Sequence, residues 1–257
     1  MLEVREIYKT FNAGTINEKR AMNGVTLTLN EGDFATVIGG NGAGKSTLLN
    51  LVAGVYPVDS GSIAIGGQNV TRLPEHKRAR FIGRVFQDPM MGTAATMQIE
   101  ENLALAARRG QSRSLRPGIT RTEREQYREL LKILDLGLED RLTSKVGLLS
   151  GGQRQAVALL MATMTPLKFL ILDEHTAALD PKTAEVIMAL TDRVIREKHL
   201  TAMMVTHNLR YAVEYGDRIL MMNRGRVVLD RAGAEKRATS MDDILTMFNQ
   251  ISLETGN

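Results

Sequence analysis

The chain has 257 residues, 43% of them hydrophobic, which is enough to bury a core in one large domain or two modest ones. Its 33 Lys and Arg against 29 Asp and Glu give a net charge of +4, which is too small to indicate a nucleic-acid binder. It has no cysteine, no signal peptide and no apolar run near the ~20 residues that span a bilayer, so we expect a soluble cytoplasmic protein without disulfides.

The first third of the chain predicts a series of strands interrupted by one helix. Alternating or continuous apolar residues bounded by Asn and Gly predict strands at 2–8, 25–29, 34–38 and 62–65. A helix is expected at 48–53, where Gly54 is placed to end it.

A mostly helical stretch follows, over about 93–165, with apolar residues at helical spacing in 100–109 and 122–134. Strands return at 169–172, 201–205 and 218–222 and alternate with helices such as 181–198, which predicts a mainly parallel sheet. The helical stretch is therefore an insertion in one α/β domain covering 1–257. A short extension, about 230–257, contains an amphipathic helix around Ile244, Leu245, Phe248 and Ile251.

The segment Gly39 to Thr47 fits the G-x-x-x-x-G-K-[ST] phosphate loop between an apolar strand and a helix. Its glycines let backbone N–H groups surround a phosphate, and the helix N-terminus favours the negative charge. We expect Lys45 to reach the β- and γ-phosphates and Ser46 to bind Mg²⁺. The other expected contacts with the nucleotide are Gly39, Asn41, Gly42, Ala43, Gly44 and Thr47. The alternative is a glycine-rich turn with a chance lysine.

Residues 169–174 are four apolar residues followed by Asp173 and Glu174. In a parallel sheet this order places both carboxylates at the carboxyl edge, where open α/β sheets bind ligands. Beside a phosphate loop, Asp173 is expected to hold Mg²⁺ and Glu174 to accept a proton from an attacking water. Without that loop, chance would explain an apolar strand ending in two acids.

Ser150 and Gln153 have the spacing of a helix capping box, and Gly151 and Gly152 lie between them. A capped helix start is one interpretation. The other is a second phosphate cradle, since two glycines leave the first-turn N–H groups accessible. One nucleotide needs one cradle, so the second is expected to face a nucleotide held by another copy of the chain.

With these motifs, the chain resembles the nucleotide-binding subunits of ATP-binding-cassette (ABC) systems from Leu2 to about Leu229. The phosphate loop, a glutamine loop, the signature segment (Leu149–Gln153), the Asp-Glu strand and a switch histidine follow in the family's order. The resemblance implies a P-loop NTPase (RecA-like) fold. It has a mainly parallel sheet core, an N-terminal antiparallel β subdomain and an inserted α-helical subdomain.

The resemblance also assigns roles to single residues. Gln87 matches the glutamine that contacts Mg²⁺, the attacking water and the membrane partner, and His207 matches the switch histidine at the γ-phosphate. Asp180 matches the loop that crosses the dimer interface, although Asp180-Pro181 is also a good helix start. Phe11 matches the aromatic that stacks on adenine, with Tyr8 as a weaker candidate and a core aromatic as the alternative.

Two features depart from the family pattern or stay open. His175 stands where proline usually follows the Asp-Glu pair, and it is either a tolerated substitution or a source of pH sensitivity. The arginine-rich segment at 108–124 is either a solvated connection or a surface for lipid head groups or an acidic partner.

As a function, the resemblance implies an ATPase that binds ATP and Mg²⁺ and closes as a homodimer. It would drive uptake of a small solute, such as an amino acid, through a separate permease at the cytoplasmic side of the membrane, with an extracytoplasmic solute-binding protein. The permease is expected to dock around 87–93 and on the helical insertion. The alternatives are an exporter, a lipoprotein-extraction system, or a soluble ATP-gated clamp on nucleic acid or ribosomes. Nucleic acid is not expected as a partner, because the insertions typical of such clamps are absent from the sequence.

Overall fold

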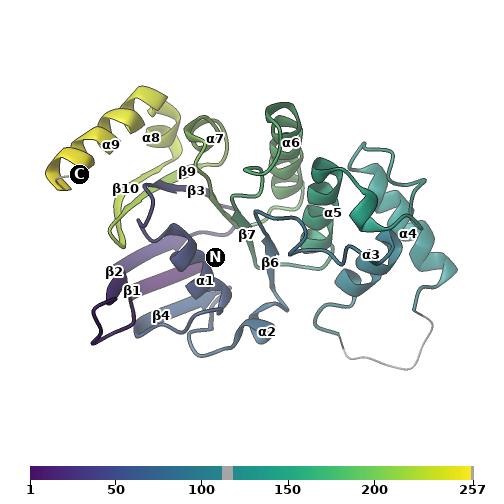
Figure 1. Cartoon of the computed structure of the whole chain (residues 1–257), viewed down its shortest axis with the longest axis horizontal. Coiled ribbons are helices and arrows are strands. Elements are labelled where there is room, and N and C mark those ends of the chain that lie inside the picture. The colour runs from purple at the N-terminus through teal and green to yellow at the C-terminus, as the bar shows by residue number, and fades with distance from the viewer. Residues whose placement is uncertain (112–117, 256–257) are drawn as a thin grey trace. The chain divides into compact units, whose positions relative to one another are not determined.

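The computed structural model describes residues 1–111 and 118–255, and the side chains only up to residue 250. Arg113 and Arg116 of the arginine-rich segment, and the side chain of Ile251, therefore lie outside the described residues. The chain forms two compact units, which are described separately (Figure 1). Unit 1 comprises Met1–Arg78 and Lys198–Asn257, and unit 2 comprises Ala79–Glu197.

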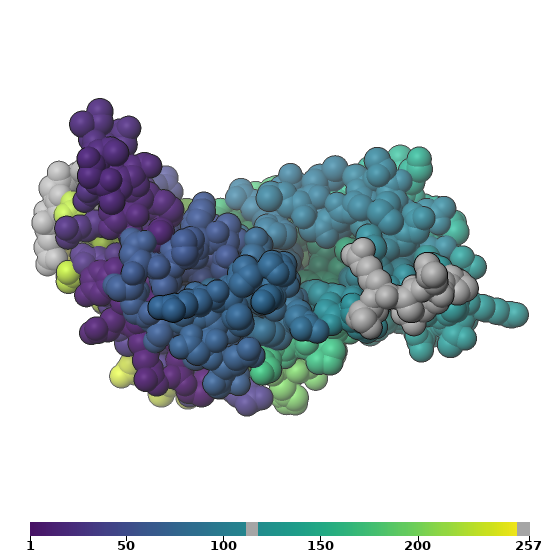
Figure 2. Space-filling model, turned by 90° about the horizontal axis from the view of Figure 1, so that it is seen from below, coloured from purple at the N-terminus to yellow at the C-terminus, as the bar shows by residue number. Residues whose placement is uncertain are grey.

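Unit 1 begins with an antiparallel sheet in the strand order β2-β1-β4-β5. Its strands are β1 (Leu2–Phe11), β2 (Lys19–Leu29), β4 (Ser60–Ile65) and β5 (Gln68–Asn69). One face is apolar because the alternating residues, such as Val4 and Leu27, are buried. The exposed connection at 12–18 between β1 and β2 belongs to the purple segment that projects in Figure 2.

The second part of unit 1 is built on β3 (Phe34–Gly39), in which every residue is buried. It pairs in parallel with β8 (Ala202–Val205) and β9 (Arg218–Asn223), and β10 (Arg226–Ala232) adds an antiparallel edge to β9. A continuous apolar strand is expected where a parallel sheet is covered on both faces.

The helices of unit 1 are α1 (Lys45–Ala53), α2 (Glu75–Arg78), α7 (Leu209–Glu214), α8 (Gly233–Ala238) and α9 (Met241–Thr255). Helix α1 begins three residues before the predicted start because the chain turns into it directly at Gly44, whose φ is 106°. The amphipathic helix predicted in the C-terminal extension corresponds to α9. Its Ile244 is buried in a cluster with Ile38, Ala212, Ile219 and Met221.

Unit 2 contains the parallel pair β6 (Ile82–Val85) and β7 (Phe169–Asp173), with a helical segment between them in sequence. Its helices are α3 (Ile99–Ala107), α4 (Arg121–Lys132), α5 (Gly151–Thr163) and α6 (Pro181–Glu197). Helix α5 contacts β6, α3, α4 and α6, so it forms the centre of the unit. None of the helices in the described ranges has both the length and the apolarity needed to cross a membrane.

Candidate functional site

The phosphate loop, Gly39–Thr47, joins β3 to α1 in unit 1, and two of its glycines are required by space and backbone conformation. A Cβ on Gly39, whose φ is 151°, would lie 2.3 Å from the Met222 carbonyl oxygen. A Cβ on Gly44, whose φ is 106°, would lie 2.4 Å from Met22 Cε. Neither position accepts a larger residue without rearrangement, so the loop is fixed in this shape by glycine.

The concave side of the loop has the features of an anion cradle. A Cβ on Gly40 would meet no atom within 4 Å, and α1 starts at Gly44 without a side-chain cap. The N–H groups of Ser46 and Thr47, in the first turn of α1, have no acceptor within the helix, so a bound anion can accept from them. The buried Lys45 donates from Nζ to the carbonyl oxygens of Gly39 (2.7 Å) and Gly40 (3.1 Å), which holds its cation beside the cradle.

His207 lies at the same edge of the sheet as the phosphate loop. Val205 of β8 is in register with Val37 of β3, and the Thr206 N–H donates to the Val37 carbonyl oxygen at 3.2 Å. The exposed His207 follows directly. Asn208 begins α7, and its Oδ1 accepts from the backbone N–H groups of Arg210 and Tyr211, which confirms the predicted N-cap.

Phe11 ends β1 as one member of an aromatic pair. Its ring meets that of Tyr56 edge to face, with ring centroids 5.2 Å apart, and Lys9 Nζ lies 5.6 Å from the Phe11 centroid. Tyr8 packs instead across the backbone at Gly24, where an added Cβ would lie 2.9 Å from the tyrosine hydroxyl. Sequence reasoning missed Tyr56. Its position, just after Gly54 at the end of the phosphate-loop helix, was the available signal.

In unit 2, Gln87, Asp173 and Glu174 lie at one edge of the β6–β7 pair. Val85 is in register with Leu172, so both strands end at the same level and the polar residues follow there. Glu174 has a φ of 48°, a left-handed conformation that costs a non-glycine residue about 1–2 kcal/mol. This turn takes the chain sharply off the strand immediately after the two carboxylates.

Asp173 is paired with an arginine that sequence reasoning did not select. Arg84 of β6 donates from Nη2 to Asp173 Oδ2 at 2.8 Å, and both side chains are mostly buried. The only signal in the sequence was a charged residue inside the otherwise apolar strand Ile82–Val85.

His175 is fully buried and its ring is directed at α6. Its Nε2 lies 3.0 Å from Thr191 Oγ1, while the Thr191 hydroxyl donates to the Ile187 carbonyl oxygen at 2.7 Å. Because the single hydroxyl proton is used in that bond, the imidazole Nε2–H is the donor to Thr191. Burial lowers the pKa of His175 from 6.5 to about 4, so the ring is neutral at neutral pH.

The signature segment forms the capping box that its spacing predicted. The Gln153 N–H donates to Ser150 Oγ at 3.3 Å, and the Ser150 N–H donates to Gln153 Oε1 at 3.2 Å. Ser150 uses its oxygen as an acceptor there, so its hydroxyl proton can still be donated elsewhere. Gly152 is buried, and a Cβ on it would lie 2.2 Å from Thr183 Cγ2, so this glycine also lets α5 approach α6.

The exposed Asp180 starts α6 in the way its sequence predicted. Its Oδ1 accepts from the Thr183 N–H at 3.1 Å, and Pro181 is the first residue of the helix. Hydrogen bonds from Thr183 lower the pKa of the Asp180 carboxyl below its usual value. Gly151 lies near this connection, where a Cβ on it would contact Leu179 Cδ2 at 3.3 Å.

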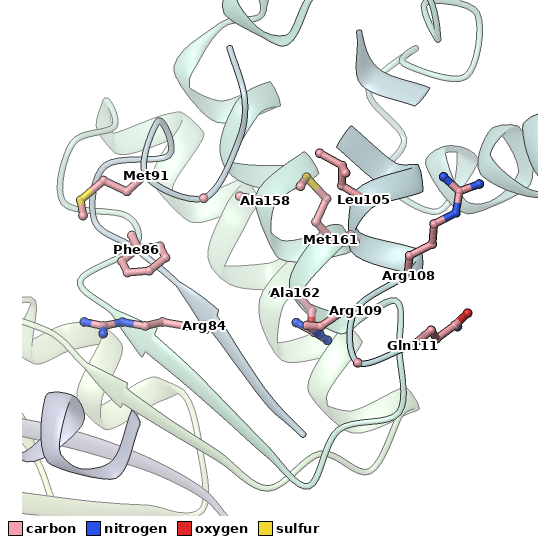
Figure 3. A pocket seen from close by; sticks show the side chains of 13 residues that line it. Arg84, Phe86, Met91, Leu105, Arg108, Arg109, Gln111, Ala158, Met161 and Ala162 are labelled. Atoms are coloured by element: carbon pink, nitrogen blue, oxygen red, sulfur yellow. The ribbon is translucent and has the colours of Figure 1, made fainter. Parts of the chain in front are cut away.

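Unit 2 also contains a cavity of about 640 Å³ between the segment after β6, α3 and α5 (Figure 3). Its lining is mixed: it combines apolar side chains, including Phe86, Met91, Leu105 and Met161, with three arginines, Arg84, Arg108 and Arg109. The Arg84 guanidinium carbon lies 4.6 Å from the centroid of the Phe86 ring. Met91 and Leu105 are exposed, so the cavity presents apolar groups to solvent.

Within the arginine-rich segment, the described side chains of Arg109 and Arg124 have partners that lie outside the segment. Arg109 donates to the Ala162 carbonyl oxygen at 2.9 Å and to Thr165, and burial lowers its pKa. Arg124 forms a two-bond ion pair with Glu100, at 2.6 and 2.8 Å. These two arginines therefore connect helices inside unit 2, rather than serving only as a solvated charge cluster.

The types of group at these two edges fit a nucleotide and a hard cation. The open cradle beside Lys45 suits a polyphosphate, and the donors predicted for the metal are a hydroxyl (Ser46), a carboxylate (Asp173) and a carboxamide (Gln87). Oxygen donors of this kind suit Mg²⁺, which is commonly bound by few protein groups together with substrate phosphates.

Comparison with known proteins gives a consistent result. A family model described as ABC transporter matches residues 22–177. The chain is 41% identical to the tyrosine transport ATP-binding protein of Clostridioides difficile (strain R20291), covering 96% of this chain and 98% of that protein. It is 31% identical to the xylose/arabinose import ATP-binding protein XylG of Sulfolobus acidocaldarius, with 96% and 94% covered.

Two solved structures are similar over most of the chain. The dimeric structure of a post-hydrolysis state of the ATP-binding cassette MJ0796 bound to ADP and Pi has a TM-score of 0.76 and 30% identity, with 90% of this chain and 98% of that chain covered. The ADP conformation of MJ1267, an ATP-binding cassette of an ABC transporter, has a TM-score of 0.81 and 26% identity, with 100% and 99% covered. These likenesses confirm the fold expected from the sequence.

Proposed function

Because the chain belongs to the ABC transporter family and is an ATP-hydrolysing subunit, we propose that it energises uptake of a small solute through a separate membrane permease. The observation that carries the proposal is the near full-length similarity to a tyrosine transport ATP-binding protein. An amino acid or a similar small organic compound is the solute class that this relative favours.

We assign the chemistry to residues of both units. Lys45, the loop amides and Thr47 bind the phosphates, Phe11 contacts adenine, and Ser46, Asp173 and Gln87 hold Mg²⁺, which neutralises phosphate charge when bound. Glu174 accepts a proton from the water that attacks the γ-phosphate, and His207 contacts that phosphate. The left-handed turn at Glu174 supports this role, because it separates the carboxylate of Glu174 from the strand that carries Asp173.

We further propose that two copies close head to tail on two ATP molecules. The signature residues Ser150, Gly151, Gly152 and Gln153 of one copy face the γ-phosphate held by the other, and Asp180 lies at the interface. Two observations support this arrangement. Ser150 can still donate its hydroxyl proton, because its oxygen acts as an acceptor in the capping box, and Gly151 and Asp180 are exposed. A phosphate bound there would use the hydroxyl proton and the first-turn amides of α5.

The cavity beside Phe86 and Met91 is the proposed docking place for a cytoplasmic segment of the permease. It adjoins Gln87 in sequence and is lined by the helical insertion, as expected for the docking region at 87–93. Its exposed apolar residues suit an amphipathic helix, and docking there would hold the subunit at the cytoplasmic face of the membrane. An extracytoplasmic solute-binding protein would deliver the solute to the permease.

The test is affinity purification of the tagged chain from detergent-solubilised membranes, followed by uptake measurements in proteoliposomes with labelled tyrosine and other amino acids. We expect a membrane-spanning permease to co-purify and ATP-dependent uptake of one solute. Met91→Glu should lose the permease, whereas Ile16→Glu, a change at a fully exposed residue of unit 1, should retain it. Recovery of ribosomes or nucleic acid with no permease, or solute export, would contradict the proposal.

A further inference from the structure

Arg84 connects the cavity to the metal-binding edge of unit 2. Its guanidinium donates to Asp173 Oδ2 at 2.8 Å and lies 4.6 Å from the Phe86 ring centroid, and Arg84 is one of the residues that line the cavity. Figure 3 shows Arg84 and Phe86 projecting side by side from the segment that borders the cavity. The same cation therefore touches the carboxylate assigned to Mg²⁺ and the wall assigned to the permease.

The Arg84–Asp173 pair competes with a metal ion for Asp173. The two side chains are only 14% and 18% exposed, so their attraction is weakly screened by solvent. A cation brought to this carboxylate either shares it with Arg84 or displaces the arginine, and the charges of Mg²⁺ and a guanidinium repel each other. The ion pair therefore lowers the affinity of Asp173 for the metal.

The contacts of Arg84 other than the ion pair with Asp173 are weak or incomplete, so they do not hold the guanidinium in one position. Its Nε–H is buried without a hydrogen-bond partner among the described residues, so the guanidinium does not satisfy all its donors in this position. The stacking on Phe86 is a weak interaction compared with a hydrogen-bonded ion pair, and it is not directional along the ring face. A shift of the guanidinium toward an acceptor in the cavity would satisfy this donor.

We propose that Arg84 couples the cavity to Asp173: an occupant of the cavity that attracts the guanidinium frees the carboxylate for Mg²⁺. Coupling of this kind is reciprocal, so metal binding at Asp173 must raise the affinity of the cavity for its occupant by the same factor. Arg84 acts here through Asp173 and is a positioning residue. The inference rests on the proposed ATPase site and on the proposed docking place.

The first experiment measures Mn²⁺ binding by electron paramagnetic resonance, with a non-hydrolysable ATP analogue, so that no turnover is needed. Arg84→Gln should bind Mn²⁺ roughly tenfold more tightly than the wild-type chain, the equivalent of one hydrogen bond to a charged group. Arg84→Lys keeps the charge and should stay within about threefold of wild type.

Arg108→Gln is the matched control. Arg108 is another arginine of the cavity wall, but its ion-pair partner is Glu123, at 3.3 Å, instead of Asp173. Its loss should leave Mn²⁺ affinity unchanged. Equal or weaker Mn²⁺ binding by Arg84→Gln overturns the coupling alone. Failure of the wild-type chain to bind the metal and nucleotide overturns the proposed site and the coupling with it.

The second experiment measures a change at the cavity wall by fluorescence. The chain has no tryptophan, so Phe86→Trp places a single tryptophan against Arg84, and its emission is followed with excitation at about 295 nm, where the tyrosines absorb little. Adding Mg²⁺ to the chain with the bound analogue should change the emission of this tryptophan, and Phe86→Trp combined with Arg84→Gln should lose most of that change. An identical response in both variants would show that Arg84 does not transmit metal binding to the cavity.

Discussion

His175 Nε2 donates a hydrogen bond to Thr191 Oγ1, at 3.0 Å, and so attaches the turn after Asp173 and Glu174 to the middle of α6. The turn begins at the left-handed Glu174 and is closed by a bond from the Ala177 N–H to the Glu174 carbonyl oxygen, at 2.9 Å. The buried imidazole thus stabilises a backbone conformation that is unfavourable on its own. The sequence left open a tolerated substitution or a source of pH sensitivity, and the burial of the ring gives His175 a structural role that neither interpretation included.

This burial predicts how stability depends on pH. The pKa of His175 is about 4 in the folded chain and about 6.5 in the unfolded chain, so the unfolded state binds the proton more readily. The contribution is complete above about pH 6.5 and is lost as the pH falls toward 4. The free energy of unfolding should decrease by about 2 kcal/mol from this group between roughly pH 7 and pH 5.

The measurement is urea unfolding of the metal-free chain at a series of pH values, with His175→Gln for comparison. The variant is expected to be less stable at neutral pH but to lose less stability on acidification, because glutamine does not titrate. Since the other titrating groups are common to both proteins, the difference between the two slopes isolates His175. Parallel pH profiles would mean that the imidazole is not buried in the neutral form.

Replacement of Glu174 tests its assignment as the general base. Glu174→Gln should slow ATP turnover by roughly 10²–10⁴-fold, because the amide cannot accept the proton of the attacking water. ATP-dependent dimerisation, measured by light scattering, should persist. Glu185→Gln removes an exposed carboxylate of α6 and should leave turnover near the wild-type rate. An unchanged rate in Glu174→Gln would exclude this carboxylate as the base.

The buried Arg78 predicts a requirement for stability in unit 1. Its guanidinium donates to the carbonyl oxygens of Leu51, Val52 and Leu73, each at 2.8 Å, and so satisfies the C-terminal end of the phosphate-loop helix. Arg78→Met should lower the free energy of unfolding by about 2–4 kcal/mol, because buried carbonyls lose their donors. Urea unfolding checks this, and Arg72→Met is a control outside this network.

The features that could be predicted from sequence were those determined by neighbouring residues. The phosphate loop, the strand ending in Asp173 and the caps at Ser150, Asp180 and Asn208 each depend on spacing within a few positions. The Arg84–Asp173 pair joins residues 89 positions apart, and it exists only because β6 pairs with β7. A charged residue in a strand gives no indication of its partner until the strand order is known.

Gly152 is a second residue whose full role could not be predicted from neighbouring residues. Its local sequence indicates that a phosphate can reach the helix start, whereas its contact with α6 indicates that it is also needed for helix packing. A Cβ at this position would lie 2.2 Å from Thr183 Cγ2. Gly152→Ala should therefore lower the free energy of unfolding by about 1–3 kcal/mol through overpacking between α5 and α6. Thr183→Ser removes the methyl group that such a Cβ would meet, but keeps the backbone N–H that donates to the capping Asp180 Oδ1.

The double variant Gly152→Ala with Thr183→Ser separates the two roles. Its stability should return to within about 1 kcal/mol of Thr183→Ser alone, since a cavity then accepts the new methyl group. ATP turnover is the second readout. Recovery of stability together with turnover would assign Gly152 to packing only. Recovery of stability with turnover still lost by at least roughly tenfold is the result we expect, because the added methyl group would also obstruct the first-turn amides offered to the opposing phosphate.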